Sequence, residues 1–200
     1  GKGLKRYTKE PFLKDGELIW REGPQKSLDE SVLTSVENAF SKTGGLKVLK
    51  GNIGTSVIKT SAVKEENWIV EAPAIIFEDQ EELLEAFKRK ELNKDFIAVV
   101  RYQGPKAKGM PELHRLTPVL SILQNNGYKV ALATDGRMSG ASGKVPAAIH
   151  LSPEAMDGGL LSKLKDGDLL RLDAVKGELI CFNEAEIKAR IAPKPPVISQ

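Results

Sequence analysis

Two apolar runs, each followed at once by a polar segment rich in glycine, limit the folds open to this chain of 200 residues. Residues 95–102 and 128–134 have the length and apolar character of buried strands. The first leads into QGPKAKGMPE, residues 103–112, and the second into ATDGRMSGASGKVPAAIHLSP, residues 133–153. Glycine and small hydroxyl residues just beyond a strand end are typical of a loop that closes on a polar ligand. Two such junctions predict one shared site.

Two familiar loop motifs do not fit the second segment. A phosphate-binding P-loop has serine or threonine after its lysine, whereas Val145 follows Lys144 and the glycines have the wrong spacing. A nucleophile elbow has glycine two residues before and after its serine. Around Ser139 these places hold Arg137 and Ala141. The segment is therefore predicted to be neither a nucleotide P-loop nor an esterase-type elbow.

Many short strands and a few helices are expected from the pattern of apolar residues. The periodicity predicts helices over residues 27–40, 79–92 and 117–126 and a helical segment near 145–150. Short strands are predicted at residues 18–20, 46–49, 56–60, 68–70, 74–77, 95–102, 128–134, 169–173 and 178–182. Short strands in this number favour a barrel or sandwich, and two strand–helix units favour a mixed sheet. The predicted fold class is α/β, a compact mixed β-barrel flanked by helices.

Capping residues mark two of the helix starts. Asp79 is predicted to cap the helix over residues 79–92, with Glu82 completing a capping box. Thr117 and Pro118 are predicted as the N-cap and the first helical residue of the next helix.

The composition argues against nucleic-acid-binding, membrane and disulfide-bonded proteins. Lysine and arginine number 30 against 27 acidic residues, and the charges are interspersed, so no nucleic-acid-binding stripe is expected. No apolar run is long enough to cross a bilayer, and no signal peptide is readable at Gly1, so no membrane partner is expected. One cysteine excludes an intrachain disulfide and suits the cytoplasm.

The chain is expected to form one main domain with extended ends, because 40% hydrophobic residues suffice for one sizeable core. We predict an irregular N-terminal arm over residues 1–28, the barrel domain over 29–191, and a flexible proline-rich tail over 192–200.

Several motifs resemble one enzyme family. TDGRMSGASGKVPAAIHLSPEA, QGPKAKGMPEL, GNIGTSVIKTSAV and DGDLLRLD are similar to segments of the dehydratase family that contains dihydroxy-acid dehydratase and 6-phosphogluconate dehydratase. QGPK, GRMSGASGKVP and the WREG and SLD segments of the arm resemble the phosphogluconate branch more closely. A dihydroxy-acid or other sugar-acid dehydratase domain is the alternative within the family. A non-catalytic swivelling module that binds a ligand or partner is the alternative outside it.

The resemblance implies that this chain is part of a larger protein. Family members are longer, and an N-terminal domain of the same enzyme supplies the cysteine ligands of an iron–sulfur cluster. This chain then resembles the C-terminal swivelling β-barrel domain and contributes no cluster ligand, since Cys181 is its only cysteine. A small buried hydrophobe is the simpler interpretation of Cys181. The resemblance further implies a homodimer and a fragment that is inactive alone.

The implied activity is that of a hydro-lyase, which converts 6-phosphogluconate to 2-keto-3-deoxy-6-phosphogluconate in the Entner–Doudoroff pathway. Ser139 matches the family's catalytic base, and Glu112 matches a glutamate that binds Mg²⁺ in the dihydroxy-acid branch. From the residues alone, a cap of a helix or turn is the favoured interpretation of Ser139, and the family match reverses that preference. Glu112 could equally open a helix. Basic side chains of the two loops are candidates for the substrate's phosphate or carboxylate: Lys106, Arg137, Lys144 and, less favoured, Lys108. His114 and His150 could assist proton transfer or be structural.

Overall fold

The computed structural model describes residues 7–139 and 143–196. It divides the chain into two compact units, residues 1–43 and residues 44–200, and each is described by itself below. The predicted boundaries after residues 28 and 191 stay predictions.

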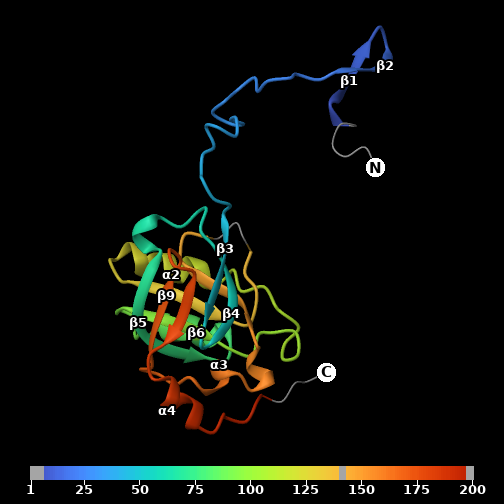
Figure 1. Ribbon diagram of the computed structural model, residues 1–200. Helices are drawn as coiled ribbons and strands as arrows, with labels where there is room; N and C mark the ends of the chain where they lie inside the picture. The colour runs from blue at the N-terminus through green and yellow to red at the C-terminus, as the bar shows by residue number, and fades with distance from the viewer. Residues whose placement is uncertain (1–6, 140–142, 197–200) are drawn as a thin grey trace. The chain divides into compact units, whose positions relative to one another are not determined.

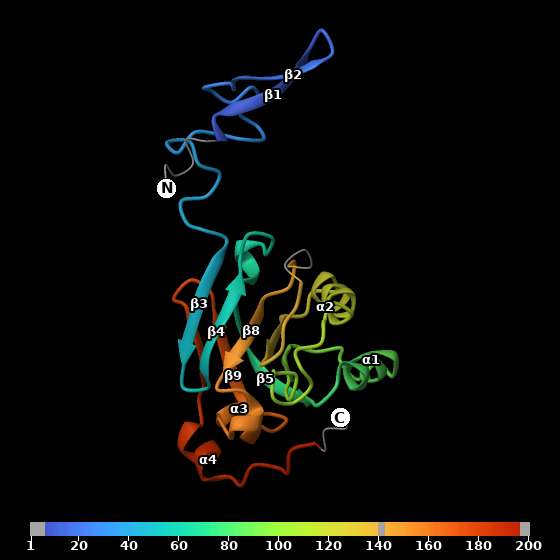
Figure 2. The ribbon, with the colours of Figure 1, turned by 90° about the vertical axis from the view of Figure 1, so that its right-hand side faces the viewer.

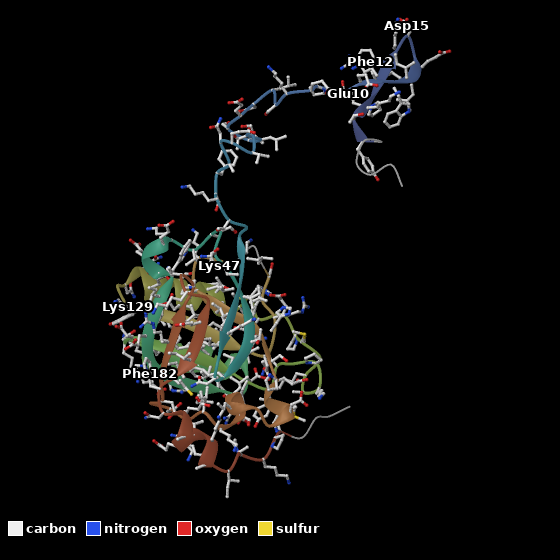
Figure 3. The ribbon with its side chains drawn as sticks, in the orientation of Figure 1. Glu10, Phe12, Asp15, Lys47, Lys129 and Phe182 are labelled. Atoms are coloured by element: carbon white, nitrogen blue, oxygen red, sulfur yellow. The ribbon has the colours of Figure 1, made fainter. Side chains whose placement is uncertain are left out.

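The first unit contains one hairpin of two antiparallel strands, β1 (Lys9–Lys14) and β2 (Glu17–Glu22). The predicted strand at residues 18–20 lies within β2. The Arg21 side chain lies over the Phe12 ring and bonds the Glu10 carboxylate at 2.7 Å; Figure 3 labels Phe12 and Glu10.

The prediction of a helix over residues 27–40 is wrong. The segment forms turns and bends, and Leu33, Val36 and Phe40 are exposed. An isolated amphipathic helix of this length is marginal in water, because most of its stability comes from packing its apolar face. The spacing of apolar residues alone was therefore an insufficient signal.

The second unit is a closed barrel of eight strands (Figure 1). They are β3 (Leu46–Gly51), β4 (Gly54–Lys59), β5 (Ile69–Phe77), β6 (Phe96–Val100), β7 (Val130–Thr134), β8 (Ala147–Ser152), β9 (Leu169–Asp173) and β10 (Glu178–Cys181). Their order around the barrel is β10-β3-β4-β8-β7-β6-β5-β9. Strands β5, β6, β7 and β8 run parallel, and most other neighbours are antiparallel. The predicted mixed α/β barrel is confirmed.

Both faces of β6 and β7 are covered, which explains their unbroken apolar sequences. Ile97 and Val99 point into the barrel core, whereas Phe96, Ala98 and Val100 belong to a second cluster with the flanking helices. These helices are α1 (Gln80–Lys88) and α2 (Leu116–Asn125), which lie together on one flank in Figure 2. The predicted helical flank is therefore present.

The predicted N-cap of α1 is confirmed, and the predicted N-cap of α2 is wrong. Asp79 accepts the Glu81 N–H, and the Glu82 carboxylate accepts the Glu78 N–H, one residue before the place that a capping box uses. Helix α2 begins at Leu116 with no side-chain cap, and the Thr117 hydroxyl contacts a methionine sulfur instead.

Two strand assignments also change. The expected strands at 68–70 and 74–77 are one continuous strand, β5. The expected helical segment near 145–150 is wrong, because residues 147–152 form β8 between β4 and β7. A short apolar run does not distinguish helix from strand, and pairing with both neighbours decided the outcome.

Two short helices that the sequence did not predict follow β8 and β10: α3 (Leu160–Lys163) and α4 (Glu184–Ala189). Arg190, next to α4, forms two hydrogen bonds of 2.6 and 2.9 Å with the buried carboxylate of Asp168. This pair ties the C-terminal helix to the turn before β9. On the barrel's opposite end, Lys47 lies 4.5 Å over the Trp68 ring (Figure 3).

Candidate functional site

The parallel strands bring three loops to the same end of the barrel. They are the β6 loop (residues 101–110), the β7 loop (residues 135–139) and the β8 loop (residues 153–157). Buried Asp135 links all three, because its carboxylate accepts N–H bonds from Tyr102 at 3.2 Å and from Gln103 and Ala155 at 2.9 Å. The two loops that the sequence predicted to share a site are therefore adjacent, and a third joins them.

A second buried carboxylate holds the same loops. Glu154, in the β8 loop, accepts the backbone N–H of Lys106 at 3.1 and 3.3 Å. Gly104 lies so close that a Cβ there would overlap the Glu154 carboxylate, so the contact requires glycine. In Figure 1 the chain after β6 and the segment after β8 lie close together accordingly.

A pocket of about 220 Å³ lies between the loops. Its lining includes Met110 of the β6 loop, Asp135 of the β7 loop, His150 at the end of β8, and Glu154 and Asp157 of the β8 loop. The pocket thus opens where the three loops meet, and carboxylates form much of its polar lining.

Three non-glycine residues around this pocket have left-handed backbone conformations. The φ angles of Tyr102, Met110 and His150 are 61°, 58° and 57°. Such conformations are costly for residues with a Cβ and cluster at functional sites, where the surrounding structure enforces them. This strain supports a functional interpretation of the loop end.

Glu112, Arg137 and Ser139 form a connected group. The Glu112 carboxylate accepts the Ser139 backbone N–H at 2.6 Å and a bond from the Arg137 guanidinium at 3.2 Å. Arg137 also donates to the Met110 carbonyl at 2.7 Å, so the group adjoins the pocket. Ser139 is exposed, and Gly140, the next residue of the motif, lies outside the described residues.

Lys106 lies at the same end of the barrel, and its ammonium pairs with the Asp157 carboxylate. This hydrogen bond raises the pKa of the Lys106 side chain, so Lys106 keeps its positive charge at neutral pH. Lys106 can reach a ligand in the pocket because its side chain is largely exposed.

The remaining candidates do not line this pocket. Lys108 lies in the β6 loop and pairs with Asp79 just after β5. His114 is exposed just before α2. Lys144 adjoins α2, where its carbonyl accepts a bond from Gln124, and it lines a separate pocket of about 530 Å³. The structure therefore brings Lys106, Lys108, Glu112, Arg137, Ser139 and His150 to one end of the barrel, and Lys144 lies apart from the pocket there.

The residues of this chain do not fit an iron–sulfur cluster. Cys181 is its one cysteine and is buried in the barrel core. Burial raises the pKa of its thiol, which disfavours the thiolate that a metal needs.

Glu112 does not by itself complete a Mg²⁺ site within the described residues. The guanidinium of Arg137 occupies one of its carboxylate oxygens, and a cation there would meet a like charge. Among residues 7–139 and 143–196, no three histidine, cysteine or acidic side chains form a metal-binding group. The prediction of Mg²⁺ at Glu112 stays untested.

Asp135 and Glu154 are the site residues that sequence reasoning missed. Asp135 directly follows β7, and Glu154 stands in the SPEA segment after β8. Their position just beyond strand ends was the only available signal. Their partners are 20 to 48 residues away in sequence, so the pattern alone did not reveal them.

Comparisons with known proteins identify the family of this chain. The family model for the dihydroxy-acid/6-phosphogluconate dehydratase C-terminal domain matches residues 31–199. The chain is 59% identical over 197 residues to a phosphogluconate dehydratase of Pseudomonas aeruginosa, covering 98% of the chain and 32% of that protein. It is 57% identical over 191 residues to the phosphogluconate dehydratase of Escherichia coli K12, covering 95% of the chain and 32% of that protein.

A dihydroxy-acid dehydratase of Agathobacter rectalis is 41% identical over 179 residues, which covers 86% of the chain and 32% of that protein. The chain therefore spans about a third of the length of the curated relatives it matches. In the described part of the chain, no helix combines the length and apolar character needed to cross a membrane.

Proposed function

The chain belongs to the dihydroxy-acid/6-phosphogluconate dehydratase C-terminal family, and on that premise we propose that it is the C-terminal part of a phosphogluconate dehydratase. The observation that carries this proposal is the difference in identity: 57–59% to two phosphogluconate dehydratases against 41% to a dihydroxy-acid dehydratase. The proposed substrate is 6-phosphogluconate, and the product is 2-keto-3-deoxy-6-phosphogluconate.

The proposed reaction removes one water molecule. A base takes the weakly acidic proton from C2 of the substrate, the C3 hydroxyl leaves, and the resulting enol becomes the 2-keto acid. We assign the base to Ser139, which stands in the β7 loop beside the pocket. The serine hydroxyl must be activated by nearby donors or a cation. Arg137, two residues away, provides a positive charge in this loop.

Glu112 supports this assignment through the backbone. Its carboxylate holds the Ser139 N–H at 2.6 Å and the Arg137 guanidinium at 3.2 Å, so it fixes both ends of the segment Arg137–Ser139. The Ser139 side chain is not part of either bond. Ser139→Ala therefore retains the backbone N–H that Glu112 accepts.

This chain covers about a third of the length of its relatives, so we also propose what the rest of the protein contributes. We propose that the part of the protein outside this chain supplies any iron–sulfur cluster and the remaining substrate contacts, because Cys181 cannot hold a cluster alone. A homodimer and a cytoplasmic location complete the proposal.

The test is Ser139→Ala in the full-length protein. We expect turnover of 6-phosphogluconate to fall on the order of 10²–10⁴-fold, the usual cost of losing a general base. Alanine retains the N–H that Glu112 accepts, so circular dichroism and thermal melting should match the wild type. Ser61→Ala, an exposed serine in the turn after β4, is the matched control and should keep full activity.

Three outcomes would contradict the proposal. Activity of Ser139→Ala within a few-fold of wild type would remove the base assignment. A wild-type protein that prefers a branched dihydroxy acid would move the chain to the other branch of the family, and one that dehydrates no sugar acid would favour a binding module.

A further inference from the structure

Two buried carboxylates, one in the β7 loop and one in the β8 loop, hold the β6 loop. Asp135 accepts the N–H groups of Tyr102 and Gln103, and Glu154 accepts that of Lys106. We propose that Asp135 and Glu154 are positioning residues, which together clamp the β6 loop in the conformation that catalysis requires. The catalytic part of this inference rests on the proposed function.

The partners of the two carboxylates are backbone groups. Asp135 is 2% and Glu154 8% exposed, and within the described residues no lysine or arginine side chain forms an ion pair with either. Burying a negative charge is costly unless several donors surround it. A pair of apolar residues would fill the space at lower cost, so the carboxylates point to a requirement for a fixed loop geometry.

Backbone strain in the β6 loop independently supports the clamp. Tyr102 has a φ of 61° although it carries a bulky side chain, and that side chain is fully buried. Its N–H is one of the groups that Asp135 accepts. A strained residue persists only where its surroundings enforce the conformation, and the Asp135 contact supplies such a constraint.

The clamp also connects the groups proposed to act on the substrate. The β6 loop carries Lys106, and the β7 loop carries both Asp135 and Ser139. Because Asp135 joins these loops directly, it sets the position of Lys106 relative to the proposed base. A shift of about 1 Å between such groups can cost up to about 100-fold in rate.

Three variants of the full-length protein test the clamp: Asp135→Asn, Glu154→Gln and Gly104→Ala. An amide in place of the carboxylate replaces one acceptor oxygen by a donor facing an N–H group. Gly104→Ala perturbs the same contact without removing a charge, because the new Cβ would displace Glu154. It keeps the proposal testable if Asp135→Asn fails to fold.

We expect amide hydrogen exchange of a peptide spanning residues 101–110, followed by mass spectrometry, to be at least about tenfold faster in each variant. We expect kcat for 6-phosphogluconate to fall about 10- to 100-fold, with KM within a few-fold of wild type. Asp135→Asn combined with Glu154→Gln should cost less than the product of the two single effects, because both residues hold one loop.

The matched control is Asp173→Asn. Asp173 is fully buried and also accepts two backbone N–H groups, of Val175 and Lys176, but it pairs in addition with Arg171 and lies at the opposite end of the barrel. This variant should lower the melting temperature while leaving both kcat and the exchange of residues 101–110 unchanged. A purely structural role for Asp135 would likewise leave kcat unchanged, although exchange of residues 101–110 would become faster.

Unchanged exchange in residues 101–110 would overturn the clamp. Faster exchange with wild-type kcat would overturn its catalytic part. A wild-type protein without dehydratase activity would instead overturn the proposed function and the catalytic part together, while the exchange rates would still decide whether the clamp exists.

Discussion

Two cations at the loop end of the barrel each pair with a carboxylate of the same end. Arg137 pairs with Glu112, and Lys106 pairs with Asp157. Both side chains remain largely exposed, so the pairs are screened by water and contribute little stability. An anionic ligand can therefore compete for either cation at low cost.

The weak pairing of both cations leads to a prediction for the full-length protein. We expect Lys106→Met and Arg137→Met each to raise KM for 6-phosphogluconate about tenfold or more, because a charge-assisted hydrogen bond is lost. Steady-state kinetics with 6-phosphogluconate and with gluconate distinguish the phosphate from the shared carboxylate. A larger effect on the phosphorylated substrate assigns the cation to the phosphate.

Lys176→Met, at the exposed turn between β9 and β10, is the control and should leave KM unchanged. Lys144→Met completes the series, since Lys144 lies beside α2, apart from Lys106 and Arg137. A raised KM would keep its predicted role in substrate binding, and a KM equal to that of the control would remove it. No change in KM for Lys106→Met and Arg137→Met would contradict the prediction.

Among the secondary-structure elements, α4 is attached by a buried ion pair together with the core residue Ile187. Arg190 is 15% and Asp168 7% exposed at their side chains, and Arg190 also bonds Glu186 of α4. Burial alone would raise the pKa of Asp168, but the bonds from Arg190 and the Lys165 N–H outweigh it and hold that pKa below its usual value. The ionised pair therefore stabilises the folded state.

Replacing Arg190 should reveal how much its ion pair with Asp168 contributes to stability. We expect Arg190→Met to lower the free energy of unfolding of this chain by about 3 kcal/mol, since a buried carboxylate is left unpaired. Urea unfolding followed by circular dichroism measures the change. Lys188→Met, whose exposed partner is Glu184, should cost less than about 1 kcal/mol.

The effect should also depend on pH. Because the folded-state pKa of Asp168 is lowered, its contribution is complete above the unfolded value of about 3.9 and is lost as pH falls through the folded value. The difference between wild type and Arg190→Met should thus be constant near neutral pH and shrink below about pH 4. A difference that is independent of pH in this range would show that packing, not the ion pair, attaches α4.

At the scale of the whole molecule, the barrel has a core of its own but an incomplete site. The strands close on themselves, and two apolar clusters fill the interior and the space under the helices. The chain also holds one cysteine and spans about a third of its curated relatives. We therefore expect this chain to fold on its own without being active.

We expect the 200-residue chain to fold cooperatively and yet neither to take up an iron–sulfur cluster nor to dehydrate 6-phosphogluconate. The measurements are thermal unfolding, anaerobic reconstitution with iron and sulfide, and a keto-acid assay. The full-length protein, treated identically, is the positive control. Stoichiometric cluster uptake with turnover by this chain alone would refute the prediction.

The strands at the centre of the barrel were predictable because their sequences carry a local signal. Residues 96–100 and 130–134 are apolar throughout, since one face meets the barrel core and the other meets the helices. The N-cap at Asp79 was predictable for the same reason, because a cap and its partner are neighbours in sequence.

Features that depend on distant partners were settled only by the tertiary structure. Residues 147–152 became a strand because β4 and β7 offered pairing on both sides. Residues 27–40 have helical spacing but no helix, because propensity without a packed apolar face stabilises little. Asp135 gathers N–H groups from residues 102, 103 and 155, a relation that exists only once the barrel has closed. The sequence by itself thus determined the barrel's central strands and the residue types at their ends, and the closed barrel decided which of those residues meet.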